Sequence, residues 1–286
     1  MSIKVSIDAS GGDFGFPVTI NAGINALTVY DDLLVNFVGD KNGIERELNK
    51  NSLYSKLSDR IFITHANEVI NMDDSPSEAL RHKKDSSMRV AINLVKKGDA
   101  DACVSAGNTG ALMSIARFVL KTISGVDRPA IMSAVPTLKG PTHVLDLGAN
   151  IDSKPSTLLQ FAIMGSIAVQ NTENIDNPSV GLLNVGTEEL KGNEKSQQTS
   201  ELLKNSSLNY VGFVEGDDIY KGNIDVIVCD GFEGNIALKA SEGVAKMFSH
   251  FIKKSFTKNF FTKLVSILVK PVIKDFRSKV DPGKYN

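Results

Sequence analysis

The fold is indicated most clearly by residues 225–235, Asp-Val-Ile-Val-Cys-Asp-Gly-Phe-Glu-Gly-Asn. The apolar run that stops at Asp230 predicts a strand covered on both faces. Two glycines then predict a tight turn with exposed backbone N–H groups. We expect a helix after Asn235, with its positive dipole end facing the same space. The stretch therefore predicts a strand, a turn and a helix that together favour an anion.

The same arrangement recurs at residues 7–13 and 104–111. Strands alternate with helices along most of the chain, which predicts a mostly parallel, three-layer α/β fold. Two segments, Ala130–Val135 and Thr142–Leu147, are joined by a turn-rich link and predict an antiparallel hairpin. The charged segment Asn71–Lys97 predicts helix. A length of 286 residues fits one large α/β domain or two lobes.

Composition excludes several classes of protein. The formal net charge of −1 argues against a general nucleic-acid binder. Residues 246–286 carry ten Lys and Arg against two Asp, or +8, so the remainder carries −9. Cys103 and Cys229 lie in apolar runs and predict buried thiols in a reducing cytosol. The start lacks a signal-peptide pattern, so we expect a cytoplasmic protein, at most peripherally attached to a membrane.

Familiar catalytic motifs are missing from the sequence. No two glycines are separated by a single residue, so the dinucleotide fingerprint GxGxxG cannot occur. The chain also lacks a P-loop, a GxSxG serine and an HExxH zinc motif, and its four histidines are scattered. We therefore predict neither a metal site nor a cofactor.

What remains is a set of Gly, Asn and Asp turns at strand ends, at residues 8–13, 105–110, 146–150, 184–191 and 230–235. Ligands of open α/β sheets bind outside the carboxyl ends of the strands, so converging turns would form a backbone-lined phosphate site. One such turn alone is better explained as a tight βα connection. For Asp13, Asp146 and Asp230, helix capping is an equal alternative to a role in the site.

Five motifs in this order resemble the phosphate acyltransferase family of bacterial phospholipid synthesis (the PlsX type). They are Asp8–Asp13 with Pro17, Ser105–Ala111, Leu145–Asn150, Leu182–Asn193 and Asp230–Asn235. The resemblance implies transfer of a fatty acyl group from acyl carrier protein to inorganic phosphate, giving acyl phosphate. It also implies homodimers and a three-layer fold like that of isocitrate dehydrogenase and phosphotransacetylase.

Phosphate would itself be the nucleophile, so positioning and charge stabilisation can carry the chemistry. We assign Lys191 to the phosphate or the developing oxyanion, Asn235 to the thioester carbonyl or phosphate, and Asp230 to orienting Lys191. Asn108, Thr109 and Gly110 would donate hydrogen bonds to phosphate. The other expected substrate-binding residues are Asp8, Gly11, Gly12, Asp13, Asp146, Asn150, Asn184, Gly186 and Gly234.

Residues 235–274 form two amphipathic helical segments joined near Thr257. One interpretation is a dimer interface built from this hairpin. The other is an exposed tip that enters an anionic membrane surface, with lysines around it and with Phe256, Phe260, Phe261 and Leu264 at its end. The resemblance implies both uses, and docking of acidic carrier protein on the basic tail is a third.

Two departures from the family pattern matter. Asp217 stands where the family usually has Arg, and the strand and final helix that close the family's chain are expected to be absent after residue 286. Two alternatives also stay open: a phosphotransacetylase-type enzyme that uses acyl-CoA, and a non-catalytic membrane-associated scaffold.

Overall fold

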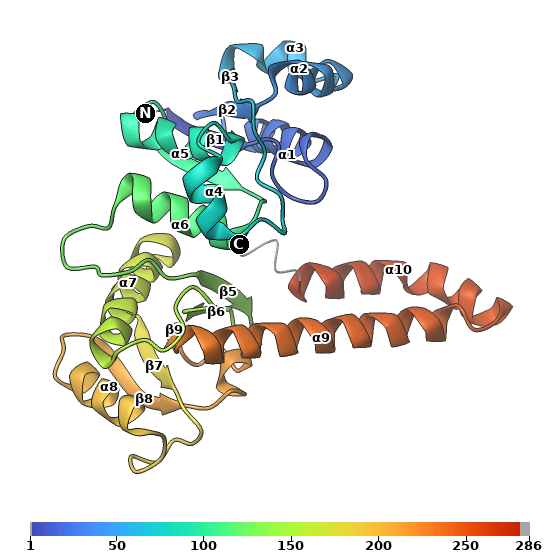
Figure 1. The fold of residues 1–286 in the computed structure, drawn as a ribbon. Coiled ribbons are helices and arrows are strands. Elements are labelled where there is room, and N and C mark those ends of the chain that lie inside the picture. Colours follow the sequence, from blue (N-terminus) through green and yellow to red (C-terminus); the bar gives the residue numbers. More distant parts are fainter. Residues whose placement is uncertain (1, 281–286) are drawn as a thin grey trace. The chain divides into compact units, whose positions relative to one another are not determined.

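The computed structural model describes residues 2–280, and side chains up to residue 276. The chain consists of two compact units that divide after Ser124. Each unit has its own sheet and its own core, so each is described by itself (Figure 1).

Unit 1 contains a four-stranded parallel sheet in the order β3-β2-β1-β4. Its elements are β1 (Ile3–Asp8), α1 (Phe16–Val29), β2 (Leu33–Gly39), α2 (Lys41–Lys50), α3 (Tyr54–Leu57), η1 (Ser58–Arg60), β3 (Ile61–His65), α4 (Pro76–His82), α5 (Ser87–Lys97), β4 (Ala102–Ser105) and α6 (Thr109–Leu120). Two of its helices begin with proline near the first position, α1 at Pro17 and α4 at Pro76. Proline suits this position because its missing N–H would have no partner in the helix.

The predicted helical segment Asn71–Lys97 contains two helices, α4 and α5. The break lies at residues 83–86, where Ser86 accepts a hydrogen bond from the Arg89 N–H and starts α5. Lys83 leaves the end of α4 to pair with Asp74 and to donate to the Val69 carbonyl. A serine cap and a tethered lysine therefore divide a run of good helix formers.

Unit 2 contains a five-stranded sheet in the order β5-β6-β9-β7-β8. Its elements are β5 (Met132–Pro136), β6 (Pro141–Leu145), α7 (Pro155–Glu173), β7 (Ser179–Leu183), α8 (Glu194–Lys204), β8 (Asn209–Val214), η2 (Asp218–Tyr220), β9 (Val226–Val228), α9 (Gly231–Phe256) and α10 (Phe260–Val280). β5 is antiparallel to β6, which confirms the predicted hairpin, and the remaining pairs are parallel.

Helices cover both faces of the unit 2 sheet, which gives the expected three layers. On one face Leu145 and Val226 pack with Phe161 of α7 and Leu203 of α8. On the other face Val144, Ile227 and Cys229 pack with Leu238 of α9 and its neighbour Ala237. β9 is therefore covered on both sides, as its continuous apolar run predicts.

The expected start of the first hairpin helix, after Asn235, is wrong. α9 begins at Gly231, directly after the capping residue Asp230, so both glycines lie inside its first turn. A Cβ atom at Gly231 would lie 2.4 Å from the Asn150 carbonyl oxygen, and one at Gly234 would lie 2.0 Å from that of Asp146. The two glycines allow a close approach of two backbones and do not form a turn.

α9 extends away from the sheet and α10 returns alongside it, which forms the predicted hairpin with bounds 231–280 (Figure 1). The connection lies at residues 257–259, where Thr257 caps the end of α9. The helix α10 contains Pro271 in its interior.

Candidate functional site

In unit 1, the strands β1 and β4 are parallel neighbours whose carboxyl ends carry Asp8 and Ser105. The Ser105 hydroxyl donates to Asp8 Oδ2 at 2.6 Å and accepts from the Gly107 N–H at 3.1 Å. Asp8 is buried, and its Oδ1 has no hydrogen-bond partner within the described part of the chain. A Cβ at Gly11 would lie 2.4 Å from Asp8 Oδ2, so glycine is required beside this carboxylate.

The loop between β1 and α1 contains Gly12 and Asp13. Gly12 has a φ of +83°, and a Cβ there would lie 2.8 Å from the Ala106 carbonyl oxygen. It therefore needs glycine both for its left-handed backbone and for its close approach to the loop after β4. Asp13 is exposed at the surface of the loop.

The helix α6 is capped by a neutral amide. Asn108 Oδ1 accepts from the Ala111 N–H at 3.0 Å, and Asn108 Nδ2 donates to the Met72 and Asp74 carbonyls at 2.9 and 3.0 Å. The side chain of Asn108 is thus fully used within unit 1. The backbone N–H groups of Thr109 and Gly110 have no acceptor among residues 2–280, and both residues are exposed. These two donors are the ones that a helix N-terminus offers to an anion.

In unit 2, the carboxyl ends of β6, β9 and β7 lie side by side. Asp146, directly after β6, is fully buried. Its carboxylate accepts from the N–H groups of Ile131, Ala149 and Asn150 and from the Asn150 side-chain amide, over 2.6–3.1 Å. Asp146 and Asn150 therefore hold the loop after β6 in shape.

Asp230, directly after β9, caps α9. Its carboxylate accepts from the N–H groups of Phe232, Ser153 and Asp152 at 2.9, 2.6 and 3.3 Å, and from Lys195 Nζ at 3.3 Å. Burial alone would raise the pKa of Asp230, but the N–H groups of Ser153 and Phe232 and the Lys195 ammonium outweigh it and lower the pKa. The carboxylate occupies the positive end of α9, the place where we expected a bound anion.

The cation beside Asp230 is Lys195, and sequence reasoning did not single it out. It lies in the first turn of α8 and also approaches Asp152 Oδ1 at 3.6 Å. A lysine at this end of a helix is unfavourable for the helix dipole, which is a signal that a carboxylate elsewhere in the fold pairs with it. Ser105 is the second missed residue, because nothing in its local sequence indicates Asp8 as its partner.

The loop after β7 carries Asn184, Gly186 and Lys191. Asn184 Nδ2 donates to the carbonyls of Gly186 and Lys191 at 3.1 and 3.2 Å, which closes the loop on itself. The Lys191 side chain is exposed, and its ammonium has no ion pair or hydrogen bond within the described chain. Its charge is therefore available to a ligand.

Asn235 lies in the second turn of α9, beside the loop after β6. A Cβ at Gly148, whose φ is +111°, would lie 3.2 Å from Asn235 Cβ. Because β9 lies between β6 and β7, the loops that contain Gly148 and Lys191 and the start of α9 all leave the same edge of the unit 2 sheet.

Comparison with known proteins identifies the family. Residues 3–286 match the family described as "Fatty acid synthesis protein". The chain is 64% identical over its full length to a phosphate acyltransferase from Ruthia magnifica, of which it covers 84%. It is 54% identical to one from Hydrogenovibrio crunogenus, again over 84% of that protein, and 51% identical to one from Legionella pneumophila, over 83%.

The chain belongs to the phosphate acyltransferase family. Its fold is also found in the phosphotransacetylase EutD from Staphylococcus aureus, with a TM-score of 0.59 at 18% identity over 86% of this chain and 83% of that one. The predicted likeness to the phosphotransacetylase fold is thereby confirmed.

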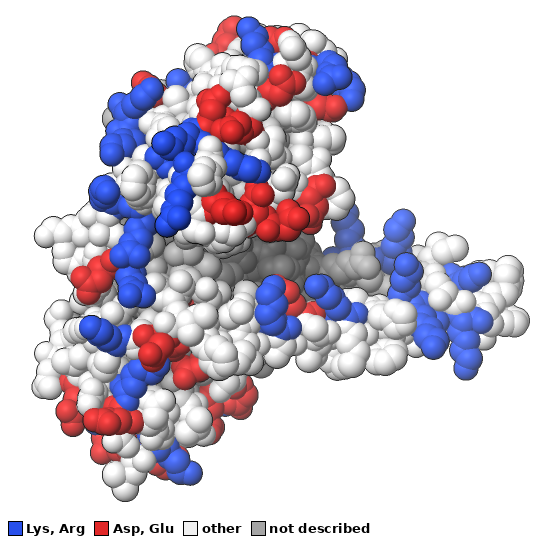
Figure 2. Space-filling model, viewed as in Figure 1, with Lys and Arg blue, Asp and Glu red and all other residues white. Residues whose placement is uncertain are grey.

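The hairpin of α9 and α10 ends in exposed aromatic and aliphatic side chains. Phe260 and Phe261 are 73% and 79% exposed, Leu264 is 50% exposed, and Phe256 is half-buried. Figure 2 shows basic residues gathered over the outer part of the hairpin, where Lys253, Lys254, Lys258 and Lys263 lie. None of the helices described between residues 2 and 280 is long and apolar enough to cross a membrane.

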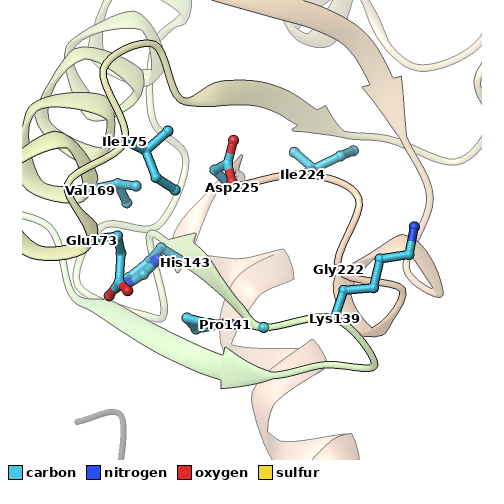
Figure 3. A pocket seen from close by; sticks show the side chains of 10 residues that line it. Lys139, Pro141, His143, Val169, Glu173, Ile175, Gly222, Ile224 and Asp225 are labelled. Carbon is cyan, nitrogen blue, oxygen red and sulfur yellow. The ribbon is translucent and has the colours of Figure 1, made fainter.

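A polar hollow of about 200 Å³ lies at the other end of the unit 2 sheet, where the parallel strands begin. His143 Nε2 lies 3.5 Å from Glu173 Oε1, and Figure 3 shows the ring directed toward that carboxylate. His143 pairs with Val226 at the start of β9, whereas Asp230 follows the end of β9. The hollow is therefore separate from the candidate site at the carboxyl ends of the unit 2 strands.

No cluster of three or more His, Cys, Asp or Glu side chains that could hold a metal ion occurs in the described part of the chain. Both cysteines are free thiols, and burial raises the pKa of Cys103 to about 11 and that of Cys229 further still. Neither thiol is activated as a nucleophile.

Proposed function

We propose that the chain transfers a fatty acyl group from acyl carrier protein to inorganic phosphate and releases acyl phosphate. Its family and the names of its relatives support acyl transfer to phosphate. The observation that carries the proposal is the exposed ammonium of Lys191 in the loop after β7, which has no ion pair or hydrogen bond within residues 2–280. The thiol of Cys229, which follows the neighbouring strand β9, is buried and protonated. A site with a cation and no activated side-chain nucleophile suits a reaction in which the acceptor, phosphate, is itself the nucleophile.

In the proposed reaction, a phosphate oxygen attacks the thioester carbonyl carbon. The new C–O bond forms, the C–S bond breaks, and the thiolate of the carrier leaves and takes up a proton. Lys191 neutralises the charge of phosphate or of the tetrahedral oxyanion, and the Asn235 amide donates to the thioester carbonyl oxygen. Asp230 and Asp146 act indirectly, because their hydrogen bonds hold the start of α9 and the loop after β6.

In unit 1, the proposed phosphate donors are the free N–H groups of Thr109 and Gly110. Asn108 supports them by capping α6. Its side-chain amide already donates to the Met72 and Asp74 carbonyls, so we assign it no hydrogen bond to phosphate. Asp8 with Gly11 and Gly12 gives the adjoining loop its shape. Asp13, Asn184, Gly186, Asn150 and Gly234 stay in the proposal as residues that shape the loops.

The hairpin supports further proposals about partners. We propose that α9 and α10 form a homodimer interface and that Phe260, Phe261 and Leu264 contact an anionic membrane surface. The basic surface also suits an acidic carrier protein, and we propose carrier thioesters as the acyl donor. Sedimentation velocity checks the dimer, co-sedimentation with anionic liposomes checks the membrane contact, and activity with both kinds of thioester checks the donor.

Lys191→Met tests the chemistry. We expect acyl-phosphate formation, trapped with hydroxylamine, to fall at least about 100-fold while the melting temperature stays unchanged, because the exposed lysine supports charge but not packing. Lys204→Met is the matched control, since Lys204 is an exposed lysine of the same unit whose partner is Glu189. Full activity of Lys191→Met would remove Lys191 from the mechanism, and an inactive wild-type protein would favour the scaffold alternative.

A further inference from the structure

Unit 2 contains an apolar cavity of about 500 Å³ that has not yet been given a role. It lies between the β5–β6 hairpin, η2 and the first half of α9. Its wall is formed mainly by carbon, from residues that include Ala134, Val135, Val144, Leu147, Ile219 and Leu238. Its size is within the range of about 300–1,000 Å³ that is typical of small-molecule sites, and its lining suits a hydrocarbon ligand.

One end of the cavity adjoins the candidate site. Leu147 directly follows Asp146, and Leu238 follows Asn235 by three residues, so it lies on the same side of α9 one turn further on. Gly148, next to Leu147, is the residue that packs against Asn235. An acyl chain whose carbonyl oxygen accepts from Asn235 can therefore enter the cavity directly.

The polar groups in the cavity wall already have partners. Tyr220 and Ser241 are hydrogen-bonded through their hydroxyls, and Ser241 Oγ also lies 2.6 Å from the Ala237 carbonyl. Glu242 pairs with Lys239 at 3.2 Å and with Lys246 at 3.9 Å. Because these groups are satisfied, a hydrocarbon chain can cover them without leaving an unpaired hydrogen-bonding group.

Small side chains keep the cavity open along α9. Ala237, Ser241 and Ala245 recur every four residues and line it in sequence. Ser241 lies about 9 Å along the helix axis from Asn235, and Ala245 lies about 15 Å from it. Their exposure rises from the half-buried Ala237 to the exposed Ala245, so the cavity opens away from the candidate site.

We propose that this cavity binds the hydrocarbon tail of the acyl donor and that the small residue at position 241 sets the longest chain it accepts. This inference rests on the proposed acyl-transfer function and adds the place where the tail binds. Each buried methylene should strengthen binding roughly fourfold, so the cavity favours long chains over short ones.

The test compares Ser241→Phe with Ser241→Ala. Both variants remove the hydrogen bond to Tyr220, but only phenylalanine fills the cavity. With octanoyl and palmitoyl carrier thioesters, we expect Ser241→Phe to lower kcat/KM at least about tenfold for palmitoyl and less than about twofold for octanoyl. Ser241→Ala should keep the wild-type preference. Equal losses for both chains, or an unchanged profile in Ser241→Phe, would overturn the proposal.

A second measurement separates this proposal from the acyl-transfer function. Wild-type protein should bind a fluorescent long-chain fatty acid that palmitate displaces, Ser241→Phe should bind it at least about tenfold more weakly, and Ser241→Ala should bind it like the wild type. Ala245→Phe serves as a second filling variant if Ser241→Phe does not fold. A wild-type protein that makes acyl phosphate but binds no fatty acid contradicts the cavity proposal alone. A change of oligomeric state in the filling variants without a change in fatty-acid binding would instead indicate that a second copy covers this face.

Discussion

The helices α6 of unit 1 and α9 of unit 2 both begin a few residues after a strand, at a junction with glycines and a polar capping residue, yet their N-termini differ. α6 is capped by the neutral amide of Asn108, and the N–H groups of Thr109 and Gly110 have no acceptor within residues 2–280. α9 is capped by the carboxylate of Asp230, and its Gly231 N–H donates to the Asn150 carbonyl. Similar sequence signatures thus produce an open N-terminus in α6, whose N–H groups can bind a ligand, and a closed one in α9, where a carboxylate of the chain occupies that position.

The difference follows from the charge of the capping residue. A buried carboxylate satisfies both the N–H groups and the dipole of its own helix, whereas an amide satisfies the hydrogen bond and leaves the dipole uncompensated. In unit 1 the open end suits an anionic ligand. In unit 2 the closed end is structural, and the free charge is that of Lys191 in the neighbouring loop.

The largest expected effect concerns the closed end. Gly234→Ala would place a methyl group against the Asp146 carbonyl oxygen, which belongs to the backbone and cannot move aside. We expect the free energy of unfolding to fall by about 3 kcal/mol, measured by urea denaturation. Gly243→Ala on the same helix is the control, since nothing lies within 4 Å of its added methyl group. It should stabilise α9 by about 0.5–1 kcal/mol, and similar losses in both variants would contradict the close-approach explanation.

Asp230→Asn tests the charged cap at the same helix. The folded-state pKa of Asp230 lies below its ordinary value of 3.8, so its ionised form stabilises the fold above that pH, and this contribution is lost as pH falls through the folded-state pKa. At pH 7 the variant should lose about 2 kcal/mol of stability, and the difference from the wild type should shrink in acid. Asp99→Asn, at an exposed carboxylate, is the control and should change the free energy of unfolding at pH 7 by less than about 0.5 kcal/mol. A difference independent of pH would show that charge is not the cause.

The smallest effect is expected at the open end. Asn108→Asp keeps a cap on α6 but adds a negative charge where phosphate is proposed to bind, so the KM for phosphate should rise about tenfold, or about 1.4 kcal/mol. Asn108→Ser is the matched control, because it also loses the amide donors to Met72 and Asp74 but stays neutral. Steady-state kinetics should give a clearly smaller rise for serine. Equal values for both would indicate that the loop tether matters and the charge does not.

Much of the fold follows from local sequence. The apolar run at Val226–Val228, the cap at Asn193, and the prolines at the starts of α1 and α7 place these elements close to their observed bounds. Hydrogen bonding of side chains to nearby N–H groups and burial of apolar runs are short-range properties, so a single sequence contains them. The five glycine-containing motifs were sufficient to indicate the family.

The roles of the polar residues needed the tertiary structure. Gly231 and Gly234 look like turn residues because the sequence does not show that the backbone at Asp146 and Asn150 packs against them. Lys195 pairs with Asp230, 35 residues away, and Ser105 with Asp8, 97 residues away, contacts that only the order of strands in each sheet creates. Local sequence therefore determined where most strands and helices lie and to which family the chain belongs. The packing of distant loops decided which N–H groups, carboxylates and lysines are used internally and which stay free for a ligand, because such pairing depends on distances in space and not along the chain.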